Sequence, residues 1–181
     1  MSAPDQVSAS APASAPVAQR IAAQALTADK VASFGHLIAP GAGSRDINAG
    51  TTRRYDDVAG LDVEEGGGRA CVAIFQTDAG THRAPYRLSM FERHRIGSQS
   101  FVPMGGSRCL AIVAGIGDVP DEDAIQAFII EPGQGLTLRR DVWHHPLITI
   151  GAADILVIER IAAQVDCELM RIRGSFEVVL G

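Results

Sequence analysis

Residues 92–104 read ERHRIGSQSFVPM, and residues 143–146 read WHHP. The first segment ends a stretch of alternating apolar and polar residues, which predicts a strand over residues 86–94. One predicted face carries Tyr86, Leu88, Met90, Glu92 and His94. An ionisable pair on an apolar face must be paired, bind a metal or line a cleft, because its desolvation alone costs several kcal/mol. Glu92 and His94 are therefore the first candidate functional residues.

The spacing of these residues resembles the two motifs of cupin barrels. Gln99 follows His94 by five residues, and in the second motif Gly133 precedes His144 at the expected distance. This resemblance implies a metal set of Glu92, His94, Gln99 and His144, of which only the two histidines match the usual ligand types. A neutral amide is a weak ligand for transition metals. We therefore expect at most a weakly held divalent ion, such as nickel, manganese or zinc.

A closer resemblance covers roughly residues 25–170 and consists of short blocks in a fixed order. The blocks are Leu26-Thr27, Phe34-Gly35, Ile47-Asn48-Ala49-Gly50, Arg54-Tyr55, Glu92-Arg93-His94, residues 97–104, residues 132–135 and residues 143–146. Together they resemble ureidoglycolate lyase. The family implies a cupin-like β-barrel, usually a homodimer, that splits ureidoglycolate into glyoxylate and urea during allantoin breakdown. The chain departs from the family at Leu138-Arg139, where Tyr-His is common.

Length and composition indicate one domain with a substantial core, since the chain has 181 residues. A net charge of -5 without a basic block argues against a nucleic-acid partner. Lys30 is the only lysine and lies outside every block, so lysine Schiff-base chemistry is not expected. Cys71, Cys109 and Cys167 are far apart, and we interpret them as buried free thiols of a reducing cytosol.

The order of local signals predicts an all-β protein. Residues 1–24 are rich in Ala, Ser and Pro and predict a disordered tail without a signal peptide or membrane span. Residues 25–181 form the predicted barrel domain. A short helix is expected after Thr27, with Leu26 and Val31 as a hydrophobic staple. About ten strands follow, which favours a cupin-like jelly-roll β-barrel with a short N-terminal helix. The predicted strands are 36–39, 69–77, 86–94, 99–102, 108–115, 124–130, 136–141, 145–150, 155–161, 168–172 and 176–180.

Two adjacent histidines must point to opposite faces of a strand, so only one of His144 and His145 can line the barrel. The cupin spacing selects His144, with Ile148 and Ile150 on its face. We predict His144 as the catalytic base and Glu92 or His94 as the acid. The predicted substrate-binding residues are Arg53, Arg54, Arg83, Tyr55, Ser98, Gln99, Met104 and His145, with one of the arginines binding the substrate carboxylate.

Structural interpretations of the same residues remain open. Glu92 is then a buried partner of Arg54 or Arg83, Gln99 satisfies loop backbone groups, and Trp143 packs in the barrel wall.

The favoured hypothesis is a cytoplasmic ureidoglycolate lyase that acts on a small anionic ureido acid and needs no redox cofactor. One alternative is a metal-dependent cupin dioxygenase or isomerase. The other is a non-catalytic sensor of a small acid. We expect a homodimer and no membrane partner.

Overall fold

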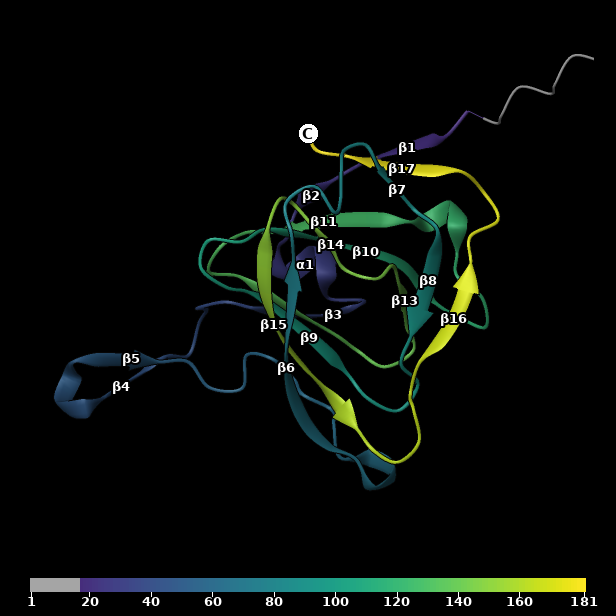
Figure 1. Cartoon of the computed structure of the whole chain (residues 1–181). Coiled ribbons are helices and arrows are strands. Elements are labelled where there is room, and N and C mark those ends of the chain that lie inside the picture. Colours follow the sequence, from purple (N-terminus) through teal and green to yellow (C-terminus); the bar gives the residue numbers. More distant parts are fainter. Residues whose placement is uncertain (1–16) are drawn as a thin grey trace, which may run out of the picture.

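A seven-stranded sheet forms the middle layer of the structure, a computed structural model that describes residues 17–181 (Figure 1). Its strand order is β16 (Glu168–Arg171), β8 (Met90–Arg93), β13 (Val142–His144), β10 (Cys109–Ile116), β11 (Gln126–Ile130) and β2 (Gln24–Ala25), and β14 (Ile148–Thr149) pairs with β10. A five-stranded sheet has the order β3 (Gly35–Ile38), β12 (Gly135–Leu138), β9 (Gln99–Pro103), β15 (Ala153–Ile161) and β6 (Arg69–Thr77). A three-stranded sheet has the order β1 (Gln19–Ala22), β17 (Phe176–Val179) and β7 (Tyr86–Arg87).

The remaining elements are short. Helix α1 spans Ala28–Val31, and three single-turn 3-10 helices are η1 (Asn48–Gly50), η2 (Glu65–Gly67) and η3 (Glu122–Ala124). Strands β4 (Arg45–Ile47) and β5 (Thr52–Arg54) form a separate hairpin that projects from the barrel at the left of Figure 1. No helix within residues 17–181 is long and apolar enough to cross a membrane.

Two hydrophobic cores lie on opposite faces of the seven-stranded sheet. Along β10, Cys109, Ala111 and Val113 belong to the core shared with the five-stranded sheet. Leu110 and Ile112 belong to the core shared with the three-stranded sheet. A strand buried on both faces needs a continuous apolar run, which explains the composition of β10.

These layers confirm the predicted all-β, cupin-like jelly roll with a short N-terminal helix. Helix α1 begins directly after Thr27, whose side chain makes no capping hydrogen bond. Leu26 and Val31 are both buried, as the staple requires.

The predicted continuous strand over residues 86–94 is wrong, because the chain changes sheets at residues 88–89. Strand β7 pairs with β17, whereas β8 pairs with β13 and β16. The alternation shifts at this break, so Tyr86 and Leu88 share a core with Phe91. Glu92 lies on the opposite face, toward β13 and His144.

Of the predicted strand over residues 145–150, only Ile148–Thr149 forms a strand, β14. Strand β13 ends at His144 and β14 begins at Ile148, with Pro146 in the connection. Ile148 packs in the core of Trp143 and not on the face of His144. The expected sharing of one face by His144 and Ile148 is therefore wrong, because proline interrupts the strand.

Strands occur within residues 17–24, the described part of the predicted tail of residues 1–24. Residues 1–16 lie outside the described part of the chain. Gln19–Ala22 forms β1, which pairs in parallel with β17, and Gln24 pairs with Phe128 of β11. The stretch is rich in Ala and Gln, which give no local signal for a strand. Its strands therefore depend on pairing with β17 and β11, which are distant in the sequence.

Acid should weaken the attachment of β16 to β8. Glu168 accepts hydrogen bonds from Arg93 and Arg95, which lower its pKa to about 2. A depressed carboxyl pKa adds stability that is present above the usual value near 4.5 and is lost as the pH falls toward 2. We expect Glu168→Gln to lose stability at neutral pH and to show a shallower decline between these values. Chemical unfolding at a series of pH values tests this, and equal slopes for both proteins would contradict it.

Candidate active site

Glu92 and His144 lie directly opposite each other on neighbouring strands. Their Cα atoms are partners in the pairing of β8 with β13, and Glu92 Oε1 lies 3.5 Å from His144 Nε2. Burial favours the protonated form of Glu92, but the hydrogen bond with His144 and the nearby histidines outweigh it and lower its pKa. Glu92 therefore holds a negative charge beside His144. Neither Arg54 nor Arg83 forms an ion pair with it within the described chain.

His144 is buried and surrounded by hydrogen-bond acceptors. Its Nδ1 lies 2.9 Å from the carbonyl oxygen of Val142, and its Nε2 lies 3.2 Å from Gln99 Oε1. Gln99 presents this oxygen because its amide nitrogen donates to Glu159 Oε2 at 2.9 Å. A carboxylate only accepts, so Glu159 fixes the orientation of the amide. His144 Nε2 consequently faces two acceptors, Gln99 Oε1 and Glu92 Oε1.

His94 differs from His144 because its Nε2 faces no hydrogen-bond acceptor within the described chain. Its Nδ1 donates to the backbone carbonyl oxygen of Asp166, which leaves the lone pair of Nε2 free in the neutral ring. This buried Nε2 has no hydrogen-bond partner within residues 17–181. The rings of His94 and His144 lie 5.5 Å apart between centroids. A nitrogen without a hydrogen-bond partner and a nitrogen that faces two acceptors therefore meet in one site.

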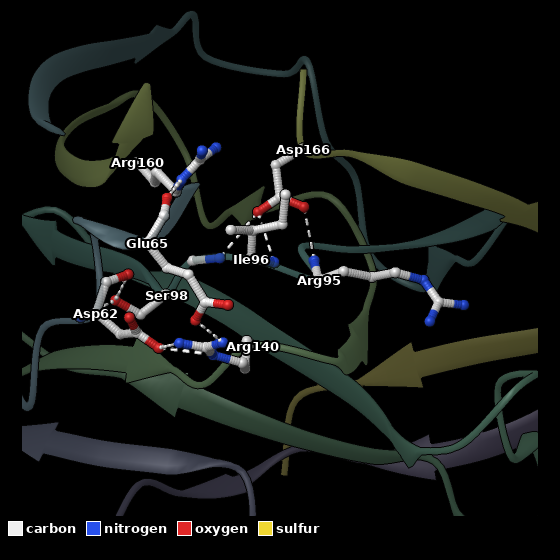
Figure 2. A network of polar contacts seen from close by, with 9 residues as sticks. Asp62, Glu65, Arg95, Ile96, Ser98, Arg140, Arg160 and Asp166 are labelled. Carbon is white, nitrogen blue, oxygen red and sulfur yellow. Dashed lines mark hydrogen bonds and ion pairs between the residues drawn. The ribbon is translucent and has the colours of Figure 1, made fainter. Parts of the chain in front are cut away.

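Backbone contacts hold the segment that carries His94. The Asp166 carboxylate accepts hydrogen bonds from the backbone N–H groups of Arg95, Ile96 and Gly97 (Figure 2). These bonds join the turn between β8 and β9 to the connection between β15 and β16. The position of His94 therefore depends on a segment about 70 residues further along the chain.

A cavity of about 190 Å³ opens between these two segments. His94, Glu159, Arg160, Asp166 and Cys167 contribute its ionisable lining. The Cys167 thiol lies 3.8 Å from Glu92 Oε2, and partial burial together with this carboxylate raises its pKa. Cys109 is buried as expected, whereas Cys167 is exposed, and all three cysteines are free thiols.

The converging atoms fit a divalent cation. Ligand atoms of Glu92, His94 and His144 all lie within 4.8 Å of one another. The unpaired lone pair of His94 Nε2 points to the same conclusion, since a metal would satisfy it. Gln99 Oε1 adds a neutral oxygen beside His144.

Two predicted substrate-binding residues are occupied by structural hydrogen bonds. His145 Nδ1 lies 2.7 Å from the carbonyl oxygen of Pro146, and its Nε2 accepts from the Ser89 N–H at 3.3 Å. Burial lowers the pKa of His145 and favours its neutral ring. Ser98 lines the cavity, but its hydroxyl accepts from the backbone of Asp62 and donates to it.

Other predicted binding residues lie away from this cavity. Arg53 and Arg54 belong to the projecting hairpin, with Arg54 paired to Asp56 and Tyr55 directly after β5 (Figure 1). Arg83 lines a separate surface hollow with His82 and Tyr86. Met104 is 43% exposed at the end of β9.

Sequence reasoning missed Glu159, Arg160, Asp166 and Cys167. The first two directly follow the apolar run of residues 155–158 in strand β15, and this change from apolar to charged residues is a local signal that could have drawn attention to them. Asp166 and Cys167 follow in an irregular connection, where periodicity gives no signal.

Comparisons with known proteins identify the family of this chain. Residues 18–179 match the family model described as ureidoglycolate lyase. A protein of Burkholderia mallei named ureidoglycolate lyase is 41% identical over 75% of this chain and 79% of its own length. A protein of the same name from Pseudomonas aeruginosa is 37% identical over 79% of this chain and 85% of its own length.

Solved structures are more distant. A Lactobacillus farciminis oxalate decarboxylase has a TM-score of 0.37 and 11% identity over 55% of this chain and 26% of that chain. Streptomyces albus HEPD has a TM-score of 0.36 and 13% identity over 51% of this chain and 18% of that chain. Family membership rests on the sequence matches, which span most of both partners. The chain belongs to the ureidoglycolate lyase family.

Proposed function

We propose that this protein is a ureidoglycolate lyase, which eliminates urea from ureidoglycolate and releases glyoxylate. One observation supports the placement of this chemistry: Glu92, His94 and His144 converge beside a cavity in a member of the family. The reaction needs a base for the carbinol hydroxyl, an acid for the departing nitrogen and a cation for the carboxylate.

The hydrogen bonds favour a different division of roles from the one predicted. His94 Nε2, with a free lone pair, takes the hydroxyl proton as the carbonyl of glyoxylate forms and the carbon–nitrogen bond breaks. His144 Nε2 faces two acceptors and so carries a proton, which it gives to the departing urea nitrogen. Glu92 stabilises the charge on His144 through its own negative charge. Proton transfer from His94 back to His144 restores the site.

As an alternative to this proton transfer, a divalent ion held by Glu92, Gln99 and the unprotonated Nε2 atoms of His94 and His144 would polarise the substrate hydroxyl and lower its pKa. The protein's own part in that case is to orient the substrate and to place its leaving nitrogen within reach of a proton donor. A nickel, manganese or zinc ion suits two imidazoles and one carboxylate.

Metal retention should be weak and should depend on residue 99. We expect purified protein to hold well below one divalent ion per chain, because Gln99 supplies a neutral oxygen. Gln99→Glu should raise retention. Gln164→Glu is the matched control, since Gln164 lines the cavity outside the converging group. Elemental analysis after chelator dialysis measures both variants. A full complement in the wild type would favour a metal-dependent dioxygenase or isomerase.

The function is tested by incubation with racemic ureidoglycolate, with urea, glyoxylate and ammonia followed separately. Equal release of urea and glyoxylate supports the lyase. Release of ammonia would indicate an amidohydrolase, and binding without products would indicate a sensor.

We further propose a cytoplasmic homodimer. Strand β6 lies at the edge of its sheet, with Val72 64% and Ile74 54% exposed, and an exposed apolar edge is commonly covered by a second subunit. The three free thiols agree with a reducing compartment. Sedimentation as a monomer at micromolar concentration would contradict the dimer.

A further inference from the structure

Arg160 differs from the other arginines near the cavity in the partners that hold it. Its Nε donates to the carbonyl oxygen of Glu65 at 2.7 Å (Figure 2). Its Nη2 donates to the carbonyl oxygen of Gly66 at 3.1 Å. Neutral carbonyl groups therefore orient the guanidinium. Arg160 takes part in no ion pair within residues 17–181, whereas Arg95 pairs with Glu168 and Arg140 pairs with Asp62 and Glu65. Its positive charge is not compensated by a carboxylate.

Glycines form a slot for the Arg160 side chain. A Cβ atom at Gly68 would lie 2.7 Å from Arg160 Cγ, and one at Gly97 would lie 2.6 Å from Arg160 Cβ. The glycine-rich turn before β6 can thus approach Arg160 closely, and Gly66, with a φ of 61°, adopts the left-handed conformation that glycine favours. Residues 64–68, which have no phosphate-loop pattern, serve here to position an arginine.

The guanidinium of Arg160 has hydrogen-bonding capacity that the protein does not use. Two of its five N–H groups are used by the carbonyl oxygens, which leaves three without a partner. Nη1 is buried and has no hydrogen-bond partner within the described chain, an arrangement that is costly for a charged donor. Arg160 lines the same cavity as His94 and Cys167.

We propose that Arg160 binds the carboxylate of the ureido acid through the Nη1 and Nη2 end of its guanidinium. This inference rests on the proposed function and identifies the cation that the elimination needs. A planar guanidinium matches a carboxylate with two parallel hydrogen bonds. Because His94 and Arg160 line the same cavity, an acid bound to Arg160 would occupy the cavity that His94 also lines.

The test compares Arg160→Gln and Arg160→Lys with the wild type on ureidoglycolate and on its carboxamide. We expect Arg160→Gln to raise the KM for the acid about a hundredfold, as is typical for loss of a charged hydrogen-bonding partner, and to lower kcat less. The preference for the acid over the carboxamide should disappear. Arg160→Lys should keep part of this preference, because it retains the charge without the fork.

Arg95→Gln is the matched control, because it removes an arginine that is ion-paired outside this cavity and should leave the KM unchanged. A folded Arg160→Gln variant that still prefers the acid would overturn the inference. If that variant does not fold, calorimetric titration of Arg160→Lys with glyoxylate decides, and affinity equal to the wild type would overturn it. A wild type that binds glyoxylate through Arg160 but releases no urea would refute the lyase and leave the carboxylate site standing.

Discussion

Replacement of His144 by alanine is expected to lower the turnover of ureidoglycolate at least about a hundredfold, the lower range for loss of a general acid or base. Its Nε2 is the atom on which Glu92 and Gln99 converge, and it is the proposed proton donor to the departing urea nitrogen. The melting temperature should change little. Steady-state kinetics and thermal unfolding of the same preparation measure both quantities.

His145→Ala is the matched control for that experiment. It should reduce turnover less and stability more, because the Ser89 N–H loses its acceptor and space opens beside the Phe91 ring. Such a loss costs about 1–3 kcal/mol. A larger rate effect for His145→Ala than for His144→Ala would contradict the assignment of His144, and not His145, to the candidate site.

Trp143→Ala should produce the largest loss of stability, about 3–5 kcal/mol, as is usual for removal of a buried aromatic ring. The ring is fully buried, its Nε1 donates to the carbonyl oxygen of Gly117 at 2.9 Å, and the guanidinium of Arg93 lies 4.3 Å from its centroid. Removal of the ring takes away the cation–π partner of Arg93. It also opens a cavity in the core between the seven-stranded and three-stranded sheets. This agrees with the predicted packing role of Trp143.

Denaturant unfolding measures this loss, and a domain stability of about 5–15 kcal/mol makes it a large fraction of the total. Trp143→Phe is the control, since it keeps an aromatic face for Arg93 and loses only the indole hydrogen bond. We expect it to lose less than half as much. A Trp143→Ala variant as stable as Trp143→Phe would show that the cation–π contact and the ring volume contribute little.

The sequence by itself determined the class of fold and the family. Alternation and apolar runs predicted β6 at residues 69–77 as the structure has it, and most other strands to within a few residues. The short blocks indicated the family that the comparisons then showed. The alternation also drew attention to Glu92 and His94, although Glu92 does not share the face of Tyr86 and Leu88, and the resemblance to the cupin spacing selected His144.

Only the tertiary structure decided how these residues meet and what surrounds them. The orientation of Gln99 depends on Glu159, and the free nitrogen of His94 depends on Asp166, both more than 50 residues away. The same holds for Arg160, whose position is set by a glycine-rich turn about 95 residues earlier. The arginines nearer to the family blocks lie on a projecting hairpin or in another hollow. In a β-barrel most contacts join residues distant in the sequence, so local patterns show which residues need partners while the strand pairing selects the partners.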